Sequence, residues 1–442
     1  MPVTRGAPDV LVVGAGLAGL ACAHDLLRSG LDVCVVEASD GVGGRMRSDR
    51  VGDGSGDTFV VDRGFQVFNT SYPQVRRRLS LRELRLRPFT PGVLVHTDRG
   101  RFRFSDPTRG AAHDPGRTGA HDPSHDPARG PARGPRRYAD LLPGRLAGAR
   151  DLLALGVLSA RDLLAPVRIL KRGEESTTRT ALATAGFSEE FVERFFRPFL
   201  SGVFLEDELE TSSRVFHLVW RSMLRGTLCL PTDGIGAVPA RLADALPDGT
   251  VRLDTAVGRL TDEGALLTTG KEIGARAVVV ATGPGPAAAL LPGLEVPPYR
   301  VVSTYYHVCE PSPLPEPTLL MDARRRFLNT CVLSEVVPGY APAGRSLVAT
   351  SVLGEDEPGR EGRVREALAE VYGVATGGWA PLTVRTVRDA LPAMPPPQPL
   401  SRAAAVGPGR YVCGDHRATG SVQGALASGA RAAREVLRDV GG

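Results

Sequence analysis

The fold is decided near the start of the chain, in residues 9–19, which read Asp-Val-Leu-Val-Val-Gly-Ala-Gly-Leu-Ala-Gly. Val10 to Val13 are all apolar β-forming residues, a pattern that predicts a short strand buried on both faces. Leu17 to Leu27 repeats apolar residues at helical intervals, and Gly30 is placed to end that helix. A second apolar run, Val33 to Val36, follows. The stretch therefore predicts a βαβ unit.

The glycines between the first strand and the helix have the G-x-G-x-x-G spacing of a dinucleotide site. Gly14 permits the tight turn, Gly16 lets a pyrophosphate approach the backbone, and Gly19 lets helix and strand pack closely. The N terminus of the helix offers free N–H groups and the positive end of its dipole to phosphates. Glu37 ends the second strand, where it is placed to accept hydrogen bonds from ribose hydroxyls. A glycine-rich turn in an ordinary α/β domain is the alternative reading.

A second glycine pair narrows the choice of dinucleotide. Ala38 opens the segment Ala-Ser-Asp-Gly-Val-Gly-Gly-Arg, which brings Gly43, Gly44 and Arg45 to the end of the same strand. An NAD site has no need of this pair, whereas a longer cofactor still has a pyrophosphate and a flavin to place. With Glu37 before it, the segment resembles that of the two-dinucleotide-binding-domain flavoproteins. The resemblance is to the amine oxidase and phytoene desaturase superfamily, protoporphyrinogen oxidase-like proteins included, in which this arginine lies against FAD.

Later segments extend the resemblance. In this superfamily an Asp-x-Gly passes beneath the flavin ring, and residues 62–65, Asp-Arg-Gly-Phe, match it; the alternative is a strand end followed by a turn. Around Val257 the family's strand contacts the adenosine half of FAD, and residues 277–283 resemble its second flavoprotein signature. Gly414 and Asp415 match the segment that closes over FAD, where the carboxylate accepts from a ribityl hydroxyl. A helix from Gly424 would then point its N terminus at the flavin.

The resemblance implies non-covalent FAD, because Cys413 lies on the wrong side of the Gly-Asp pair for covalent attachment. The residues that would hold it are Gly14, Gly16, Leu17, Ala18, Gly19, Glu37, Ala38, Gly43, Gly44, Arg45, Gly64, Phe65, Val257, Ala281, Thr282, Gly283, Gly414, Asp415, Ser421, Val422, Gln423 and Ala425.

The expected fold is α/β: a Rossmann-like FAD domain of the two-dinucleotide-binding-domain type, with an inserted α+β substrate domain that includes a helical lobe. We expect the FAD domain to comprise residues 1–68, 228–295 and 388–442, and the substrate domain residues 69–227 and 296–387. Residues 106–137 contain Asp-Pro and Gly-Pro repeats with almost no large apolar side chain, which predicts a disordered insertion. The histidines of this insertion are not expected to hold a metal, since such repeats keep no fixed geometry.

Composition and charge restrict the kinds of partner that the chain is expected to bind. The net charge of +5 over 442 residues equals the excess of nine arginines over four aspartates in residues 99–137, so nucleic-acid binding is not expected. No apolar run reaches the length of a membrane span, and the first apolar stretch is not a signal peptide. The six cysteines have no zinc-like spacing. We expect a cytoplasmic protein with no metal, and possible peripheral membrane contact through the helical lobe; the oligomeric state stays open.

The chemistry follows from the flavin, whose N5 accepts hydride while the protein supplies orientation and an apolar cavity. In the resembling monoamine oxidases a lysine holds a water near N5; it would fall near Val301 or Val302, and the chain's two lysines lie elsewhere. Ser421 replaces the tyrosine that cages an amine. These departures favour carbon–carbon dehydrogenation of an apolar small molecule, as in carotenoid desaturases, over an amine oxidase. A protoporphyrinogen oxidase-type reaction also remains open.

The catalytic residues stay unknown, with His416, Tyr305 and Tyr306 as candidates. The two tyrosines would point to opposite faces of one strand, so only one can reach the cavity. His307 is the other histidine expected near the flavin, and Arg63 would hold the flavin or pair with a carboxylate. A non-catalytic flavin-binding redox sensor is the alternative from another class. An NAD-dependent dehydrogenase fails for lack of a second G-x-G-x-x-G.

Overall fold

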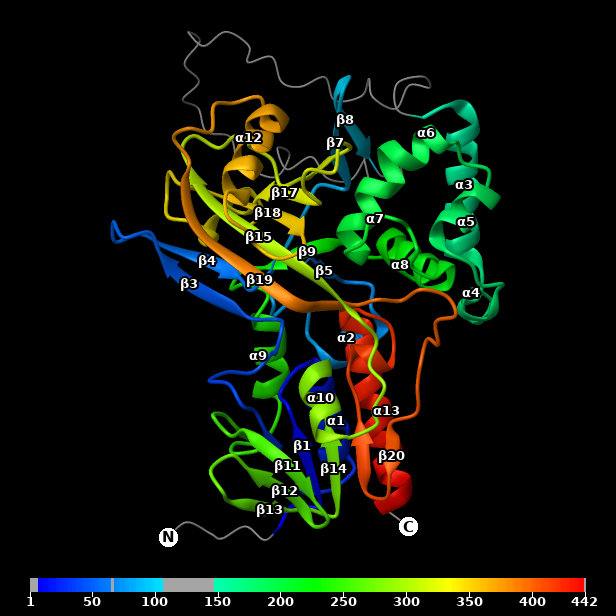
Figure 1. The fold of residues 1–442 in the computed structure, drawn as a ribbon, viewed down its shortest axis with the longest axis vertical. Coiled ribbons are helices and arrows are strands. Elements are labelled where there is room, and N and C mark those ends of the chain that lie inside the picture. The colour runs from blue at the N-terminus through cyan, green and yellow to red at the C-terminus, as the bar shows by residue number, and fades with distance from the viewer. Residues whose placement is uncertain (1–6, 65–66, 106–146, 441–442) are drawn as a thin grey trace.

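The protein was analysed as a computed structural model, which describes residues 7–64, 67–105 and 147–440 (Figure 1). The predicted insertion at 106–137 and the predicted cofactor residue Phe65 lie outside these described residues.

A six-stranded sheet forms around the predicted βαβ unit, with strand order β10-β2-β1-β14-β21-β20. The central strand, β1, is fully buried and pairs in parallel with β2 and β14, as its unbroken apolar sequence predicts. Only the edge strand β20 runs antiparallel to its neighbour. The strands are β1 (Val10–Val13), β2 (Val33–Val36), β10 (Val251–Arg252), β14 (Ala277–Val280), β20 (Ala405–Gly407) and β21 (Arg410–Val412).

Helices α1 (Leu17–Arg28) and α13 (Val422–Val440) pack together beside this sheet, although they come from opposite ends of the chain (Figure 1). Their close approach depends on Gly429, where a Cβ would lie 2.1 Å from the carbonyl oxygen of Ala18. The other face is covered by a small sheet of β11 (Val257–Thr261), β12 (Gly264–Leu267) and β13 (Glu272–Gly274). Strands β10 and β11, which follow one another in the chain, therefore lie in different sheets.

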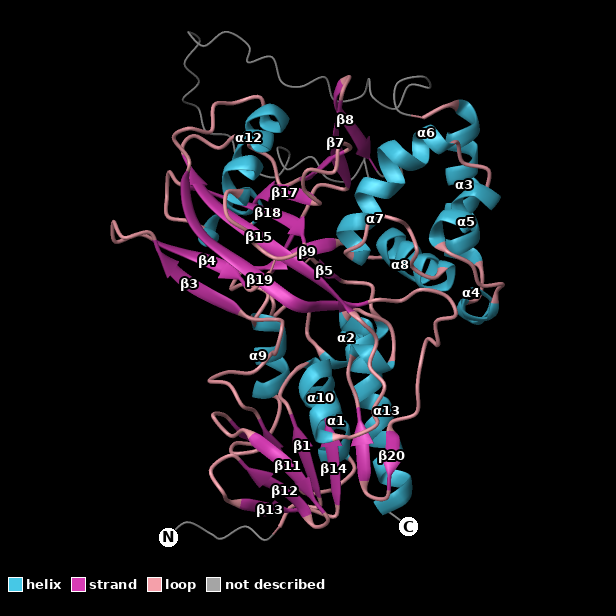
Figure 2. Ribbon diagram, viewed as in Figure 1, coloured by secondary structure: helices cyan, strands magenta, loops and turns pink. Residues whose placement is uncertain are grey.

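A second sheet has seven strands in the order β19-β15-β18-β17-β16-β7-β8. One face packs on α12 (Arg360–Tyr372), and the other contributes to an apolar cluster shared with the helical region (Figure 2). The strands are β7 (Gly92–Thr97), β8 (Gly100–Ser105), β15 (Tyr299–Cys309), β16 (Leu319–Asp322), β17 (Asn329–Val332), β18 (Ser346–Leu353) and β19 (Ala380–Pro392). Strand β19 stays paired with β15 as far as Pro392, beyond the domain boundary expected at 388.

The helical region lies beside this sheet, on the opposite side from α12 (Figure 2). It comprises α3 (Ala149–Leu164), α4 (Val167–Arg172), α5 (Thr178–Thr184), α6 (Glu189–Phe191), a π-helical turn (Val192–Phe196), α7 (Arg197–Phe204) and α8 (Ser213–Arg225). Phe191, Phe195 and Phe196 are buried together and form part of the core. Trp220 is also buried there, and its Nε1–H donates to Ser159 Oγ at 3.2 Å.

Shorter elements join the two sheets. One of them is an antiparallel hairpin of β3 (Ser48–Gly52) and β4 (Thr58–Asp62). The helix that begins at Pro73 ends at Arg78, because Leu79 and Leu84 turn into the core rather than continue one helical face. The remaining elements are α2 (Pro73–Arg78), β5 (Phe68–Asn69), β6 (Leu86–Pro88), β9 (Leu228–Pro231), α9 (Ala237–Asp244), α10 (Pro284–Leu290), α11 (Leu333–Val336) and 3-10 turns at Pro338–Tyr340 and Asp415–Arg417. Among the described residues, no helix has the length and hydropathy needed to cross a bilayer.

Candidate cofactor site and active site

The glycine-rich turn after β1 is shaped by close backbone contacts. Gly14 has a φ of +107°, and a Cβ there would lie 2.9 Å from the carbonyl oxygen of Ala281. A Cβ at Gly19 would lie 2.0 Å from the carbonyl oxygen of Gly14, so helix and turn touch directly. At Gly16 a Cβ would meet no atom within 4 Å. Gly14 and Gly19 are thus needed by the fold, whereas Gly16 faces open space at the N terminus of α1.

Glu37 fixes this turn from the end of β2. Its carboxylate accepts hydrogen bonds from the Ala15 N–H at 2.8 Å and from the Ser39 N–H at 3.0 Å. The exposed Ala38 lies between these two contacts. Val257 opens β11 two residues after Thr255, whose N–H donates to the Glu37 carbonyl at 2.8 Å. The structure therefore brings the acidic strand end, the glycine turn and the start of β11 together.

The second glycine pair meets the first. The Gly43 N–H donates to the Ala15 carbonyl at 2.9 Å, and a Cβ at Gly44 would lie 3.8 Å from the Cα of Gly16. Gly43 and Gly44 both have positive φ, +113° and +58°, which favours glycine at this bend. The two loops thus meet in close backbone contact, with Gly44 beside Gly16.

Arg45 ties this loop to two distant segments. Its guanidinium forms an ion pair with Asp415 at 2.7 Å and donates to the carbonyl oxygens of Asp389 and Ala390 at 3.1 and 2.8 Å. It also lies 5.9 Å from the centre of the Tyr299 ring. The beginning of the chain, the end of β19 and the Gly414-Asp415 turn therefore converge on one side chain.

The Gly414-Asp415 turn leads into α13. The Gly414 N–H donates to Ser428 Oγ at 3.1 Å, and Asp415 is buried against Arg45. Ser421 Oγ accepts from the Gly424 N–H at 3.0 Å and so caps the helix. Gln423 Oε1 accepts from the Gln74 N–H at 2.9 Å. The side chains of Ser421 and Gln423 are thus engaged in holding the first turn of α13 in place.

Other predicted cofactor residues lie at the ends of these elements. Leu17 and Ala18 form the first turn of α1, and Val422 and Ala425 the first turn of α13. The residues that follow β14 are Ala281, whose N–H donates to the Val13 carbonyl at 2.7 Å, then Thr282 and Gly283, the N-cap of α10.

Asp62 and Gly64 lie where β4 meets the Gly-rich turn before α9. The buried Asp62 carboxylate accepts from Ser48 Oγ at 2.5 Å and from the Ile235 N–H at 2.9 Å. Burial raises the pKa of this carboxyl to about 6. Gly64 has a φ of +85°, and a Cβ there would lie 3.2 Å from Cγ2 of Val387 on β19.

A cavity of about 630 Å³ opens between the Gly44-Arg45 loop and β19. Arg63 lies there with its Nε and Nη2 on the Asp49 carboxylate at 3.0 and 2.9 Å, which fits the expectation of a carboxylate partner. Arg385 Nη2 donates to Asp49 at 3.4 Å, and its Nε is buried without a hydrogen-bond partner among the described residues. Sequence reasoning missed this wall; the charges in the strand at 385–389, Arg-Thr-Val-Arg-Asp, were the available signal.

The two candidate tyrosines lie on opposite faces of β15, as predicted. Tyr305 faces α12 and donates its hydroxyl to Asp356, so its proposed place beside the flavin is wrong. His307 shares that face and pairs with Glu361 of α12 at 3.0 Å, so it too points away. Strand β15 is covered on both faces, and alternation in the sequence does not tell which face meets the cofactor domain. The expectations that placed Tyr305 and His307 near the flavin fail for this reason. Tyr306 faces the other way and donates to the Asp62 carbonyl at 2.7 Å.

The two remaining candidates carry no charge near neutral pH. Burial raises the pKa of the Tyr306 hydroxyl well above its usual range. Burial likewise lowers the pKa of His416 to about 4, so this imidazole is neutral. Its ring lies against Gly414, and its Nε2 is buried without a hydrogen-bond partner in the described part of the chain.

Comparisons with known proteins give the family. The profile of the family described as "Flavin containing amine oxidoreductase" matches residues 17–437. Hydroxysqualene dehydroxylase of Rhodopseudomonas palustris is 28% identical over 456 residues, covering 97% of this chain and 98% of that protein. The flavin-dependent L-tryptophan oxidase RebO of Lentzea aerocolonigenes is 45% identical, but over only 58 residues, 13% of this chain and 12% of that protein.

Solved structures share the fold at low identity. A double mutant of putrescine oxidase superposes with a TM-score of 0.65 at 18% identity, covering 98% of this chain and 99% of its own. Cyclohexylamine oxidase from Brevibacterium oxydans has a TM-score of 0.65 at 17% identity, covering 99% and 100%. These likenesses establish a shared mixed α/β fold across almost the whole chain.

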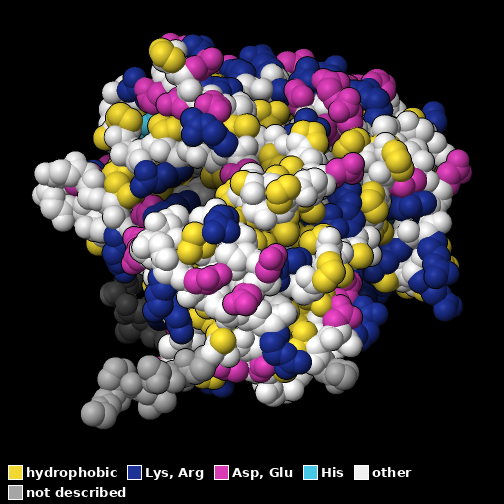
Figure 3. All heavy atoms as spheres, turned by 60° about the horizontal axis from the view of Figure 1, so that its bottom comes forward, with side chains coloured by type: hydrophobic (Ala, Val, Ile, Leu, Met, Phe, Trp, Pro, Cys, Tyr) yellow, Lys and Arg dark blue, Asp and Glu magenta, His cyan; other side chains and the backbone are white. Residues whose placement is uncertain are grey.

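FAD is the cofactor expected of such a protein, and the geometry fits it. Gly16 faces open space at the N terminus of α1, where a helix favours a pyrophosphate. Charged side chains of both signs are spread over the face shown in Figure 3. The protein is a flavin-dependent oxidoreductase, and its chain belongs to the flavin-containing amine oxidoreductase family.

Proposed function

We propose that this protein oxidises an apolar, long-chain molecule by hydride transfer from carbon to flavin, in a carotenoid desaturase-like dehydrogenation. The observation that carries the proposal is the lining of β15 beside the cofactor region. Val302 pairs with Val387, which lies against Gly64, so aliphatic side chains occupy the place where an amine oxidase has its lysine. The name of the hydroxysqualene dehydroxylase relative points to a substrate of the same apolar class.

The buried cluster between the second sheet and the helical region is apolar and aromatic, which suits an apolar substrate. Tyr306 shares one buried cluster with the aromatic residues of α6 to α8. Half-buried apolar side chains pack against this cluster, among them Phe199, Val219 and Leu391. Leu391 reaches Gly420, just before the N terminus of α13, where a Cβ would lie 2.9 Å from its Cδ1. Apolar contacts therefore continue from the helical region to the cofactor segments.

The proposal also assigns one part of the chain to FAD and the other to the substrate. Residues 1–68, 228–295 and 388–442 would hold FAD, and residues 69–227 and 296–387 would form the substrate domain with its helical lobe. A long apolar substrate resides in a lipid phase, so the proposal includes peripheral membrane contact through the helical lobe.

Bound FAD supplies the hydride acceptor. The chain's own part is binding and orientation: the N–H groups of α1 receive the pyrophosphate, Glu37 the ribose, and Asp415 a ribityl hydroxyl. Tyr306 and His416, both neutral, are suited to donate or accept hydrogen bonds without adding charge to an apolar site. Arg45 orients Asp415, because it fixes that carboxylate from one side.

An anaerobic titration of the purified protein tests the proposal. Oxidised flavin absorbs at about 380 and 450 nm, and hydride transfer bleaches the longer-wavelength band. We expect bleaching by polyprenyl hydrocarbons in detergent and none by putrescine or cyclohexylamine. Bleaching by the amines alone would favour an amine oxidase, bleaching by protoporphyrinogen alone the protoporphyrinogen oxidase-type reaction, and a flavin that no substrate reduces would favour the redox sensor.

A further inference from the structure

Exposed hydrophobic side chains concentrate on helices α3 and α4. Among the described residues eight large hydrophobic side chains are exposed, and five of them belong to this pair of helices. They are Leu153 (71% exposed), Val157 (62%), Leu164 (83%), Val167 (41%) and Ile169 (56%). The other three, Leu253, Val374 and Val406, lie in separate segments of the chain. Single exposed hydrophobics are ordinary on a protein surface, whereas a group on one helical pair marks an interaction surface.

These side chains share one face of α3. At about 100° per residue, Leu153, Val157 and Leu164 fall within an arc of about 40°. Asp151 and Asp162 fall about 120–180° away, on the inward side, and both are buried. Asp151 accepts from the Ser188 N–H at 2.7 Å, and Asp162 pairs with His217 Nδ1 at 2.8 Å. The helix thus buries its two carboxylates together with Leu158, yet leaves three large aliphatic side chains on the outward face, where an ordinary surface helix is polar.

The exposed charges of the same two helices are all positive. Arg150, Arg161, Arg168, Lys171 and Arg172 are exposed, whereas the two aspartates of residues 149–172 are buried. Aliphatic side chains flanked by cations on one helical face favour the interfacial region of an anionic bilayer, where the apolar groups enter the acyl boundary and the cations meet phosphates. This charge complementarity selects an anionic lipid surface over a second protein.

The end of α3 is fixed against α8, so the surface is preformed. Arg221 Nη1 donates to the carbonyl oxygens of Leu163 and Ala165 at 3.0 and 2.8 Å, and Arg225 donates to the Leu163 carbonyl at 2.9 Å. These arginines satisfy carbonyl groups that the helix end leaves without intrahelical partners. Docking on lipid therefore would not need to order this helix first.

We propose that the outward face of α3 and α4, formed by Leu153, Val157, Leu164, Val167 and Ile169 with their flanking cations, docks the protein on an anionic phospholipid membrane. This inference rests on the proposed membrane contact of the helical lobe, and it names the surface and the lipid charge.

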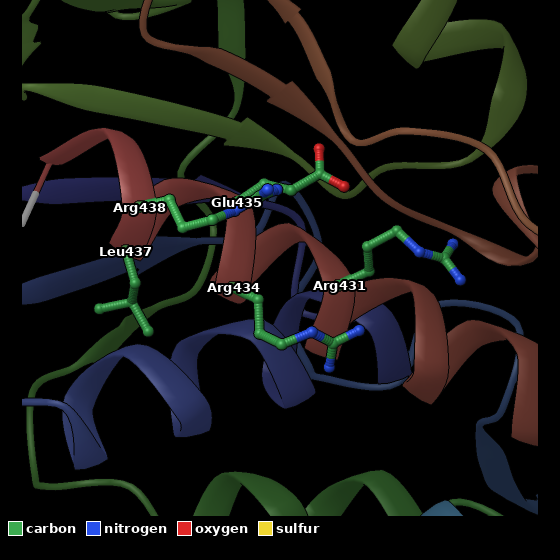
Figure 4. Close-up of a pocket in the computed structure, with 5 residues that line it drawn as sticks. All are labelled: Arg431, Arg434, Glu435, Leu437 and Arg438. Atoms are coloured by element: carbon green, nitrogen blue, oxygen red, sulfur yellow. The ribbon is translucent and has the colours of Figure 1, made fainter.

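A second basic surface supplies the matched control. Arg431, Arg434 and Arg438 of α13 surround a shallow pocket of about 540 Å³ with Glu435 and Leu437 (Figure 4). The Glu435 carboxylate is held by the N–H groups of Ala404 and Ala405 at 2.7 and 2.8 Å. None of the eight exposed large hydrophobic side chains of the described residues belongs to α13. If cations alone attracted the protein to lipid, the basic surface of α13 would contribute to binding as well. The proposed docking through α3 and α4 does not require it.

Flotation of the full-length, FAD-loaded protein with vesicles tests the proposal. We expect binding to phosphatidylglycerol–phosphatidylcholine vesicles, falling with added salt, and at least tenfold weaker binding to phosphatidylcholine alone. Leu153→Glu with Leu164→Glu should weaken binding at least tenfold, and so should reversing Arg168, Lys171 and Arg172 to Glu. Two control variants should bind vesicles within twofold of the wild type: Leu253→Glu with Val406→Glu, and Arg434→Glu with Arg438→Glu.

Three results would overturn the proposal: no binding of the wild type, an equal loss in the control variants, or a dimer in solution that the α3 variant converts to monomer without any vesicle binding. The flavin absorbance of each variant reports that it is folded. If the wild type does not bind vesicles but still turns over detergent-solubilised substrate, the docking proposal is wrong and the proposed reaction is unaffected.

Discussion

The carboxyl group of Asp62 is buried at the end of β4. Its raised pKa predicts that the stability of the fold depends on pH. The pKa is about 6 in the folded protein, against about 4 in an unfolded chain. The folded state thus favours the protonated form, and the stabilisation present below pH 4 is lost as the pH rises through 6. The whole effect is roughly 3 kcal/mol.

Asp62→Asn removes this charge and keeps an oxygen to accept from Ile235. We expect the variant to lose less thermal stability than the wild type between pH 5 and pH 7.5, measured as the midpoint of thermal unfolding at each pH. Asp248→Asn, at an exposed turn, should keep the wild-type slope. An unchanged slope in the Asp62 variant would show that this carboxyl is not the titrating group.

A substitution at Gly16 tests cofactor binding without disturbing the fold. A Cβ there meets no protein atom, so Gly16→Ala should fold with an unfolding midpoint close to that of the wild type in the absence of FAD. The methyl group would occupy the space that we assign to the pyrophosphate, and we expect FAD to bind at least tenfold more weakly in a fluorescence titration of apoprotein.

Gly285→Ala is the matched control, because its Cβ also meets no atom but lies on α10. If both variants bind FAD as the wild type does, the open space beside Gly16 is not the pyrophosphate site.

At the scale of elements, α1 and α13 are held together by a contact that only glycine allows. Gly429→Ala places a methyl group 2.1 Å from the Ala18 carbonyl, and the two helices must separate. We expect a loss of about 1–3 kcal/mol, the usual cost of overpacking, seen as a lower unfolding midpoint. Gly362→Ala, in the open on α12, should be neutral or slightly stabilising, since alanine is the better helix former. Equal midpoints for the two variants would contradict the tight packing of α1 on α13.

The elements also show what the sequence could predict. Strand β1, the hairpin β3–β4 and helix α1 follow from local pattern, because unbroken apolar runs, alternation and helical spacing are each written in adjacent residues. Helix α2 ends early and Tyr305 faces α12 for reasons set by distant residues: the core that receives Leu79, and the helix that covers the outer face of β15. The charges at 385–389 marked the wall formed by Arg385, but they could not show that its partner is Asp49, which lies 336 residues away.

For the whole molecule, Arg45 is the side chain that joins the cofactor segments to the second sheet. Its guanidinium binds the Asp415 carboxylate and, at the same time, the carbonyl oxygens of Asp389 and Ala390 on β19. A lysine keeps the charge but has no planar fork with which to satisfy the three partners together. Arg45→Lys should therefore loosen the cofactor segments from the second sheet.

We expect Arg45→Lys to weaken FAD binding at least tenfold and to lower the unfolding midpoint by several degrees. Arg326→Lys removes a similar set of contacts, to Asp322 and Glu370, at a place away from the cofactor segments. It should lower the midpoint and leave FAD affinity unchanged, because these contacts join β16 to α12 rather than to the glycine loops. If both variants lose stability while FAD affinity stays at the wild-type value in each, Arg45 holds the two regions together without forming part of the cofactor site.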